Sequence, residues 1–425
     1  MPALANDLDI PWGGHPDTVA RGSKRPAVSP SPVLLGSNLG SPSVQQRPAV
    51  LVIQTALLLL LVGSWAYCVL TVVAALRYRK TRPAPLENGP PISVLKPLWG
   101  AEDALEINLR SFFTQRYSTF EILFAVRDAA DPALIAVEKL RAEFPDQPCR
   151  VVITGEPPYA NAKVFSIVQM IDAARYDLLV MSDSDIRVTP DMLATLAAEF
   201  DSGEIDLLTC PYRAVPGPSP WSTLEAVGLN TEFLSGLLVA RLVEGVKFAV
   251  GPTIAARKSL IEGLGGFGRF REYLAEDFVL GKLAAESGYG VDLSSYVIEH
   301  HIGSQGFGQN FRHRLRWARS TRRSRPSGYA GQVFTCPLAL AILVSPLVPG
   351  WPAILALTAL FRAPAAWAVA GHVLHDPLTR SRWWLIPVQD ILGFMIWAAG
   401  FFGNQIQWRD RTYRLLSDGR FQRVP

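Results

Sequence analysis

The sequence predicts a mixed α/β domain held between membrane-spanning segments at both ends. Strand-like and helix-like segments alternate between residues 83 and 325, which is typical of βαβ units in a mainly parallel sheet. The stretch Pro48–Leu76 contains no Asp, Glu, Lys or Arg, and as a helix it could cross about 30 Å of hydrocarbon. Further uncharged stretches predict membrane helices between 330 and 408. A buried soluble core is the alternative for these later stretches.

The composition of the 425 residues excludes several classes of protein. Hydrophobic residues make up 49% of the chain and charged residues 18%, against roughly 25% charged residues in ordinary soluble domains. The net charge of +4 is too small to indicate nucleic-acid binding, so no nucleic-acid partner is expected. The four cysteines lack CxxC spacing and neighbouring histidines, which speaks against a disulfide framework or a zinc site.

The two ends of the chain differ from the part between them. Residues 1–47 are rich in Pro, Ser and Gly and predict a disordered tail, while 48–76 predicts a transmembrane anchor. A cleaved signal peptide is the alternative, but the apolar run is too long and begins too late. The basic cluster RYRKTR at 77–82 and the basic tail at 409–425 should both be cytoplasmic. Three later crossings would put the tail outside, so one later stretch is expected to be re-entrant or interfacial.

Strands and helices of the α/β part follow from local patterns. Short runs rich in apolar and β-branched residues predict strands at ISVLKP (92–97), FEILFAV (120–126), CRVVIT (149–154) and DLLVMSDSD (177–185). Apolar residues at helical spacing, and helix-start signals at Pro132 and Thr189–Pro190, predict helices at 102–117, from 132, at 162–174 and from 189. Ligands bind outside the carboxyl ends of strands in such sheets, so we expect Lys96, Asp128 and Asp183–Asp185 to be neighbours.

Two acidic residues end the fourth predicted strand. Strand residues alternate faces, so Asp183 and Asp185 should point the same way. Two carboxylates this close repel unless a cation lies between them, and oxygen ligands suit Mg²⁺ or Mn²⁺, which can also bridge a diphosphate. The alternative is a solvated turn or helix cap before Thr189.

Three further motifs carry possible chemistry. Asp128 follows a strand as Asp183 does, although RDAADP is also a turn sequence. LAEDF (274–278) places two acids before a helical segment, where they could equally form an acidic first turn. HRLRW (313–317) places several cations before the second membrane region. Arg316 or His313 could offset the negative charge on a leaving phosphate, with Trp317 packed beneath. The alternative is a positively charged flank of the membrane segment with no catalytic role.

The order of these pieces resembles family 2 and related family 21 inverting glycosyltransferases, closest to the ceramide glucosyltransferase group. The resemblance covers roughly residues 90–320 and is carried by SVLKPLWGAED, NLRSFFTQRY, FEILFAVRDAADPA, NAK (161–163), DLLVMSDSDIRVTPDML, AEDF and RWAR. It implies a catalytic domain of the GT-A type, a Rossmann-like mixed sheet found in nucleotide-diphospho-sugar transferases.

The resemblance also implies how a UDP-sugar donor is bound. Asp128 matches the aspartate that contacts the uracil, and Lys163 would lie beside the nucleotide. Asp183 matches the aspartate on the metal and donor phosphates, with Asp185 as its partner on Mg²⁺ or Mn²⁺. Lys96, at the same expected edge of the sheet, is grouped with the donor-binding residues.

The remaining matches imply catalytic roles. Asp277 matches the general base, with Glu276 as the competing candidate. Arg316 and Trp317 match the end of a Q/R-x-x-R-W motif, and His313 stands where that motif has Gln or Arg, which leaves its phosphate contact open.

The implied activity is transfer of a sugar from a UDP-sugar to a lipid hydroxyl, with the domain on the cytoplasmic face of a bacterial inner membrane. N-acetylglucosamine to a bacteriohopanetetrol-type hopanoid is expected, because the motifs resemble the bacterial branch; glucose to ceramide is the alternative. A transporter would need Arg362, Asp376 and Asp390 to line a path. A soluble Rossmann enzyme is disfavoured because no GxGxxG follows the first strand.

Overall fold

The computed structural model describes residues 46–78, 83–408 and 411–424. The predicted disordered tail lies outside the described residues except for its last two positions, and so do residues 79–82 of the basic cluster. The long helix α1 spans Gln46–Tyr78, and the residues from Val50 onwards form one compact unit. The fold and the site below belong to this unit.

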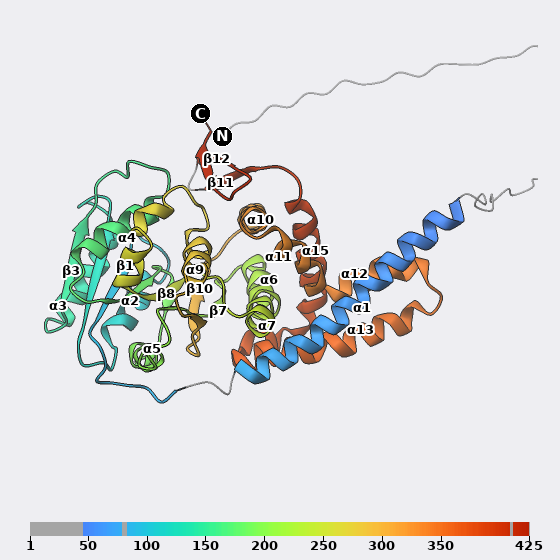
Figure 1. Ribbon diagram of the computed structural model, residues 1–425, viewed down its shortest axis with the longest axis horizontal. Coiled ribbons are helices and arrows are strands. Elements are labelled where there is room, and N and C mark those ends of the chain that lie inside the picture. The colour runs from blue at the N-terminus through green and yellow to red at the C-terminus, as the bar shows by residue number, and fades with distance from the viewer. Residues whose placement is uncertain (1–45, 79–82, 409–410, 425) are drawn as a thin grey trace, which may run out of the picture. The chain divides into compact units, whose positions relative to one another are not determined.

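A seven-stranded mixed sheet forms the centre of the α/β part (Figure 1). In spatial order its strands are β3 Cys149–Ile153, β2 Phe120–Val126, β1 Ile92–Pro97, β4 Leu178–Ser182, β8 Thr253–Arg257, β6 Leu207–Thr209 and β9 Val291–Leu293. Strands β3, β2, β1 and β4 are parallel, whereas β8 runs antiparallel to both of its neighbours. The four predicted strands and the predicted α/β class are confirmed.

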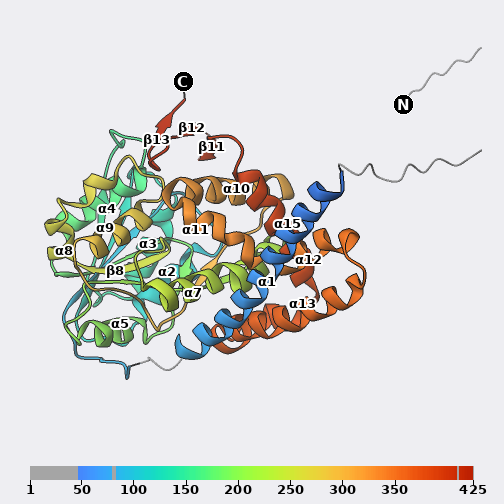
Figure 2. The same cartoon turned by 45° about the vertical axis from the view of Figure 1, so that its right-hand side comes forward.

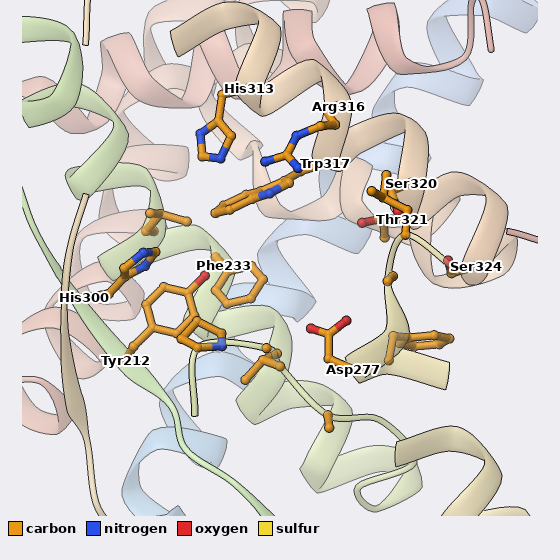
Figure 3. A pocket seen from close by; sticks show the side chains of 18 of the residues that line it. Tyr212, Phe233, Asp277, His300, His313, Arg316, Trp317, Ser320, Thr321 and Ser324 are labelled. Carbon is orange, nitrogen blue, oxygen red and sulfur yellow. The ribbon is translucent and has the colours of Figure 1, made fainter. Parts of the chain in front are cut away.

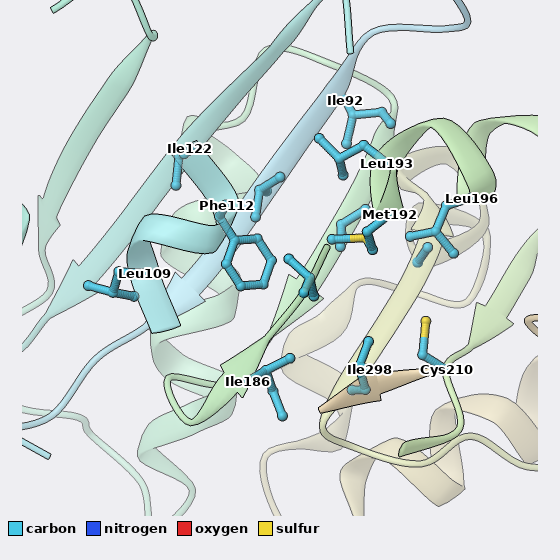
Figure 4. Close-up of a cluster of buried hydrophobic side chains, with 14 of the residues drawn as sticks. Ile92, Leu109, Phe112, Ile122, Ile186, Met192, Leu193, Leu196, Cys210 and Ile298 are labelled. Atoms are coloured by element: carbon cyan, nitrogen blue, oxygen red, sulfur yellow. The ribbon is translucent and has the colours of Figure 1, made fainter. Parts of the chain in front are cut away.

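Alternating strand residues divide the core into two layers. On one face, Ile92 and Val94 of β1 pack with helices α2 Leu105–Phe113, α3 Ala133–Glu143 and α5 Met192–Phe200, as Figure 4 shows for part of this cluster. On the other face, Leu95 packs with α4 Ala162–Ala173, α8 Lys258–Gly263 and α9 Glu276–Glu286. Helices therefore cover both faces and leave the carboxyl ends of the parallel strands for a site.

A small second sheet lies beside the carboxyl end of β4. It contains β5 Ile186–Arg187, β10 Ile298–His301 and β7 Tyr212–Val215, with β10 in the middle. The amide of His301 donates to the carbonyl of Asp185 at 2.9 Å. This pairing brings residues from near position 300 to the acidic turn after β4, which the sequence patterns did not predict.

Three helices are long and apolar enough to cross a membrane, counting only described residues. They are Val50–Tyr78, Pro220–Glu244 and Trp351–Val373, and Pro326–Thr335 with Pro337–Leu347 forms a further pair bent by 69°. The first, the third and the bent pair lie in the predicted membrane segments. Pro220–Glu244 does not: it was expected within the soluble domain, and 67% of its most apolar 18-residue window is buried in the protein, against 22% and 39% for the other two helices.

The apolar helices contact one another through buried polar groups. Helix α1 lies beside α12 Pro337–Val344 and α13 Trp351–Ala366 in both views (Figures 1 and 2), and Trp65 donates to Thr358 at 3.1 Å. Arg362 forms an ion pair of 2.8 Å with Asp390 on α15 Ile386–Gly400, and both side chains are buried.

The ionisable groups that a transport path would need are occupied elsewhere. Arg362 and Asp390 pair with each other, and Asp376 accepts from Asn230 at 3.0 Å while it caps helix α14 Pro377–Ser381. None of these three side chains lines the large cavity described below. The structure therefore gives the transporter alternative no support.

The C-terminal residues form a three-stranded antiparallel sheet on the α/β domain. Its strands are β11 Gln405–Trp408, β12 Arg411–Leu415 and β13 Phe421–Arg423. The amide of Phe421 donates to the carbonyl of Glu272 at 2.9 Å, and the sheet's apolar residues pack against Ala160 and Leu274. Strands β12 and β13 lie in the predicted basic tail at 409–425, whereas β11 lies at the end of the segment predicted as membrane helices, 330–408, whose last helix ends at Gly400. The sheet contacts the segment that precedes Asp277. If the hydrophobic segments after the α/β domain cross a membrane, they do so an even number of times.

Replacing Phe421 by Ala should detach this sheet. Phe421 is buried, and removal of a buried phenylalanine ring lowers the free energy of unfolding by about 3–5 kcal/mol. A sheet of three short strands is too marginally stable to remain folded after this loss. We expect rapid tryptic cleavage after Arg411 or Arg414, measured by mass spectrometry. Gln422→Ala on the same strand is the control, because Gln422 is exposed. Equal protection of both variants would contradict the packing described here.

Candidate active site

One cavity of about 940 Å³ connects the α/β domain to the apolar helices. Its volume falls within the range of ligand-binding sites in proteins. At one end it is lined by Asp183, Asp185 and Lys163, and at the other by residues of α7 Leu234–Glu244, α11 Pro326–Gly331 and α15. Asp277 and Trp317 also line it, on facing walls (Figure 3).

Lys163 is surrounded by acidic groups at the polar end. Asn161 caps α4 by accepting from the amide of Val164 at 3.1 Å, which fixes the first turn and with it Lys163. The Lys163 ammonium lies 2.6 Å from Asp183 Oδ1 and 3.7 Å from Glu276 Oε1. Burial lowers the pKa of Lys163, but the two carboxylates outweigh it and raise the pKa. Lys163 is therefore protonated and offsets the charge of the acids.

The two adjacent acids at the start of α9 differ in their surroundings. Glu276 is buried, lies near Lys163, and accepts from Asn161 Nδ2 at 3.3 Å. Burial raises the pKa of Glu276 to about 7. Asp277 points into the cavity (Figure 3), and burial raises its pKa as well. A Cβ at Gly251 would lie 2.8 Å from Asp277 Oδ2, so glycine gives this carboxylate its space.

Asp185 has a histidine partner from the second sheet. Its Oδ2 lies 3.0 Å from Nε2 of His300. Burial would raise the pKa of Asp185, but the imidazole outweighs it and lowers the pKa. Likewise, burial would lower the pKa of His300, and Asp185 raises it instead. The sequence analysis missed His300; the pair His300–His301 in a chain with six histidines was the signal available.

The acidic turn fits a divalent cation that is completed by a ligand. Among the described residues no group of three or more His, Cys, Asp and Glu side chains forms a complete metal site. Mg²⁺, however, is commonly held by one or two carboxylates together with phosphate oxygens and water. Oδ1 of Asp185 is buried and has no hydrogen-bond partner within the described chain. Asp183 and Asp185 are therefore suitable ligands for Mg²⁺ or Mn²⁺ beside a diphosphate.

Lys96 lies beneath the acidic turn and does not line the cavity. Its side chain is fully buried, and its ammonium donates to the carbonyl of Asp183 at 2.6 Å and lies 3.8 Å from the Phe112 ring centroid. Burial lowers the pKa of Lys96 to about 7. The expected proximity to Asp183 is found, but the ammonium of this lysine contacts the backbone of the turn, and Lys96 is not among the residues that line the cavity.

Asp128 is exposed at the end of β2. Its Oδ1 accepts from the amide of Ala130 at 2.8 Å, which is the turn geometry considered as the alternative. The neighbouring Arg127 lines the cavity, with its guanidinium 4.4 Å from the ring centroid of Trp99, another lining residue. The structure therefore brings Asp183 and Asp185 to the cavity and leaves Asp128 outside its lining.

Helix α10 Phe307–Ser324 contributes the predicted basic motif. His313, Arg316 and Trp317 line the cavity on the wall opposite Asp277 (Figure 3). The rings of His313 and Trp317 lie 4.5 Å apart between centroids. His313 Nδ1 is 3.2 Å from the buried carboxylate of Glu225, an acid that the sequence analysis did not single out. The predicted catalytic residues thus share one cavity.

Comparison with known proteins gives the family of the chain. The profile of Glycosyl transferase family 21 matches residues 55–421. Ceramide glucosyltransferase 1 of Caenorhabditis elegans is 31% identical over 221 residues, which cover 52% of this chain and 47% of that protein. Ceramide glucosyltransferase of Komagataella phaffii is 30% identical over 121 residues, 27% of this chain and 23% of that one. The chain spans about half the length of the first of these relatives and less of the second.

Solved structures that align with this chain are less similar to it in sequence. A mannosyltransferase from Pyrobaculum calidifontis, in complex with GDP-Man and Mn²⁺, aligns with a TM-score of 0.49 and 16% identity over 82% of this chain and 99% of that one. TarS 1–349 of S. aureus aligns with a TM-score of 0.38 and 15% identity over 78% and 98%. The family profile covers most of the chain, from α1 to the C-terminal sheet. The chain therefore belongs to Glycosyl transferase family 21.

Proposed function

We propose that this protein is an inverting membrane glycosyltransferase that moves a sugar from a UDP-sugar to the hydroxyl of a lipid. The observation that carries the proposal is the single cavity whose walls are acidic and basic at one end and formed by apolar helices at the other. A water-soluble donor and a lipid acceptor have to meet in one place. Asp277 lines the same cavity and faces Trp317 across it, so we place the transfer of the sugar beside Asp277.

The donor would occupy the polar end of the cavity. Asp183 and Asp185 would hold Mg²⁺ or Mn²⁺ against the diphosphate, and the ion would supply positive charge to the leaving UDP. Lys163 would add a second positive charge there. Trp99 and Arg127 form the rim on the side of Asp128, which supports a uracil position there, as the resemblance to the family implied.

Transfer would be a single displacement at the anomeric carbon. Asp277 takes the proton of the acceptor hydroxyl as that oxygen forms its bond to the anomeric carbon, and the bond from this carbon to the UDP oxygen breaks on the opposite face. Arg316 on the facing wall would offset the charge that develops on the diphosphate. Glu225 orients His313, and Trp317 packs beside it.

Two acceptors are supported by different observations. A bacteriohopanetetrol-type hopanoid receiving N-acetylglucosamine is favoured by the resemblance to the bacterial branch, in which both acids of the D-x-D motif are present as Asp183 and Asp185. Ceramide receiving glucose is favoured by the names of the relatives. In both cases the enzyme would lie in the bacterial inner membrane with the α/β domain facing the cytoplasm, where nucleotide sugars are made.

An assay with both acceptor lipids distinguishes these two proposals. Purified protein is incubated with UDP-glucose or UDP-N-acetylglucosamine and with ceramide or bacteriohopanetetrol in detergent micelles, and glycolipids are identified by mass spectrometry. Lipid profiles of a host that lacks the gene provide the second arm. Loss of a glycosylceramide with unchanged hopanoids would select ceramide. No transfer from any UDP-sugar to any lipid would contradict the proposed function.

Removing one acid of the turn should abolish metal-dependent donor binding. Asp183→Asn keeps the shape but loses the charge that holds the cation, so we expect no turnover and weaker UDP-sugar binding in the presence of Mn²⁺, measured by calorimetry. Asp172→Asn, on the exposed face of α4, is the matched control. Full activity of Asp183→Asn, or full activity of the wild type in EDTA, would exclude this metal site.

Of the two adjacent acids, Asp277 should be the one that catalysis requires. Asp277→Asn cannot accept the proton, and a positioned base contributes roughly 10²–10⁴-fold in rate. We expect kcat to fall at least about 10²-fold with UDP-sugar affinity little changed. Glu276→Gln is the paired variant, because Glu276 is held by Asn161 and Lys163. A dead Glu276→Gln with an active Asp277→Asn would reverse the assignment.

The pH dependence of turnover should report the same carboxylate. Burial raises the pKa of Asp277 above its ordinary value of 3.8, and a base is active only when deprotonated. Activity should therefore be full above the raised pKa and fall as the pH decreases through it, giving an acidic limb of kcat above pH 3.8. The residual activity of Asp277→Asn should lack this limb. A limb that persists in that variant would belong to another group.

A further inference from the structure

A further carboxylate, that of Glu232, lines the same cavity on a helix long and apolar enough to cross a membrane. Glu232 Oε1 accepts from Thr335 Oγ1 at 3.1 Å, and Oε2 accepts from Gln389 Nε2 at 3.3 Å. Arg314 in turn donates to Gln389 Oε1 at 3.2 Å. We call these four residues the Glu232 cluster. They come from separate elements, so the fold itself assembles the cluster.

A break in helix geometry sets the position of Glu232. The long helix Pro220–Glu244 is interrupted by the π-helical turn η2 Leu229–Phe233, and such turns occur frequently at functional sites. Within this turn, Thr231 accepts from Arg362 at 3.4 Å and Phe233 packs on Tyr212 beside the cavity (Figure 3). Glu232 lies between Thr231 and Phe233 in the sequence, and its side chain lines the cavity.

The mechanism proposed above gives this carboxylate no role. Carboxylates within apolar helical segments are rare and are commonly functional. An ionised carboxylate can accept about four hydrogen bonds, and Thr335 and Gln389 supply two while the weak thiol donor of Cys336 lies 3.8 Å away. A Cβ at Gly393 would lie 2.8 Å from Oε2, and Gly393 also lines the cavity, so a glycine keeps this position open.

The walls next to the Glu232 cluster are apolar. They are formed by Leu237 and Ala240 of α7 and by Ile396 and Trp397 of α15. A ligand held here would have hydrogen-bond donors on its head and hydrocarbon beyond it. That is the chemistry of a lipid whose headgroup carries hydroxyl or amide N–H groups.

We propose that the Glu232 cluster binds the headgroup of the acceptor lipid and selects lipids that carry a hydrogen-bond donor in addition to the reacting hydroxyl. The proposal rests on the proposed function and adds a specificity-determining residue to it. The reacting hydroxyl goes to Asp277, and the second donor of the same headgroup goes to Glu232. A lipid with the reacting hydroxyl alone lacks a partner for the carboxylate and binds weakly.

The test compares acceptor kinetics of the wild type and Glu232→Gln with whichever lipid, short-chain ceramide or bacteriohopanetetrol, is glycosylated in the acceptor assay. Glutamine keeps the shape but replaces one of the two carboxylate oxygens by an NH₂ group, which donates hydrogen bonds and cannot accept one from the lipid. We expect the KM for the lipid to rise about tenfold or more, with kcat and the KM for the UDP-sugar within about twofold.

Two controls exclude a merely structural effect. Glu199→Gln changes another carboxylate that accepts from Ser294 and Ser295 but does not line the cavity, and its kinetics should match the wild type. A deoxy analogue of the lipid, with its non-reacting hydroxyls replaced by hydrogen and, for ceramide, its amide nitrogen methylated, should have a raised KM with the wild type. Glu232→Gln should not raise the KM for this analogue any further.

The outcomes separate this inference from the proposed function. Normal transfer with an unchanged lipid KM in Glu232→Gln overturns the inference alone. It is also overturned if Glu232→Gln raises the KM for the deoxy analogue as much as it raises the KM for the full lipid. Absence of any transfer by the wild type overturns the proposed function and the inference with it. If Glu232→Gln does not fold, the wild type decides: a deoxy analogue that binds as well as the full lipid contradicts the inference.

Discussion

The ammonium group of Lys163 is the contact on which the candidate active site depends. It joins Asp183, on the turn after β4, to Glu276, at the start of α9, and it is fixed by the capped first turn of α4. Without this positive charge, the carboxylates of Asp183, Glu276 and Asp277 would lie close together in the cavity and repel each other. Glu276 is engaged by this lysine, and the adjacent Asp277 points into the cavity, so the proposed division of roles between the two acids follows from one lysine.

A second constraint is that a lipid held among the apolar helices has to reach the polar groups of the α/β domain. The helix Pro220–Glu244 contacts both parts: Glu225 meets His313 of the basic motif, Thr231 meets Arg362, and Ser235 meets Tyr67 of α1 at 3.0 Å. The C-terminal sheet contacts the segments before Lys163 and Asp277 from another side. The cavity is thus enclosed by elements from both ends of the chain, in keeping with a donor and a lipid meeting there.

Local patterns predicted the elements that depend on local chemistry. The first four strands, α2 to α5 and the start of α9 were found because apolar spacing and turn residues decide them, and the glycosyltransferase prediction is confirmed by family membership. The antiparallel β8 and the sheet that brings His300 to Asp185 depend on pairing between distant segments, which one sequence does not encode visibly. Glu232 was missed because only the fold brings Thr335 and Gln389 to it. Asp128 and Lys96 were expected in contact with a donor, yet Asp128 is exposed in a turn of its own after β2, and Lys96 is buried beneath the acidic turn at Asp183.

The central claim is a single displacement in which Asp277 activates the lipid hydroxyl on the face opposite the departing UDP. The anomeric configuration of the product tests it most directly, by proton NMR of the glycolipid formed from an α-linked UDP-sugar. The account predicts a β-linked sugar, because one displacement inverts the anomeric carbon. An α-linked product would contradict it, since retention needs either a second displacement or attack from the same face.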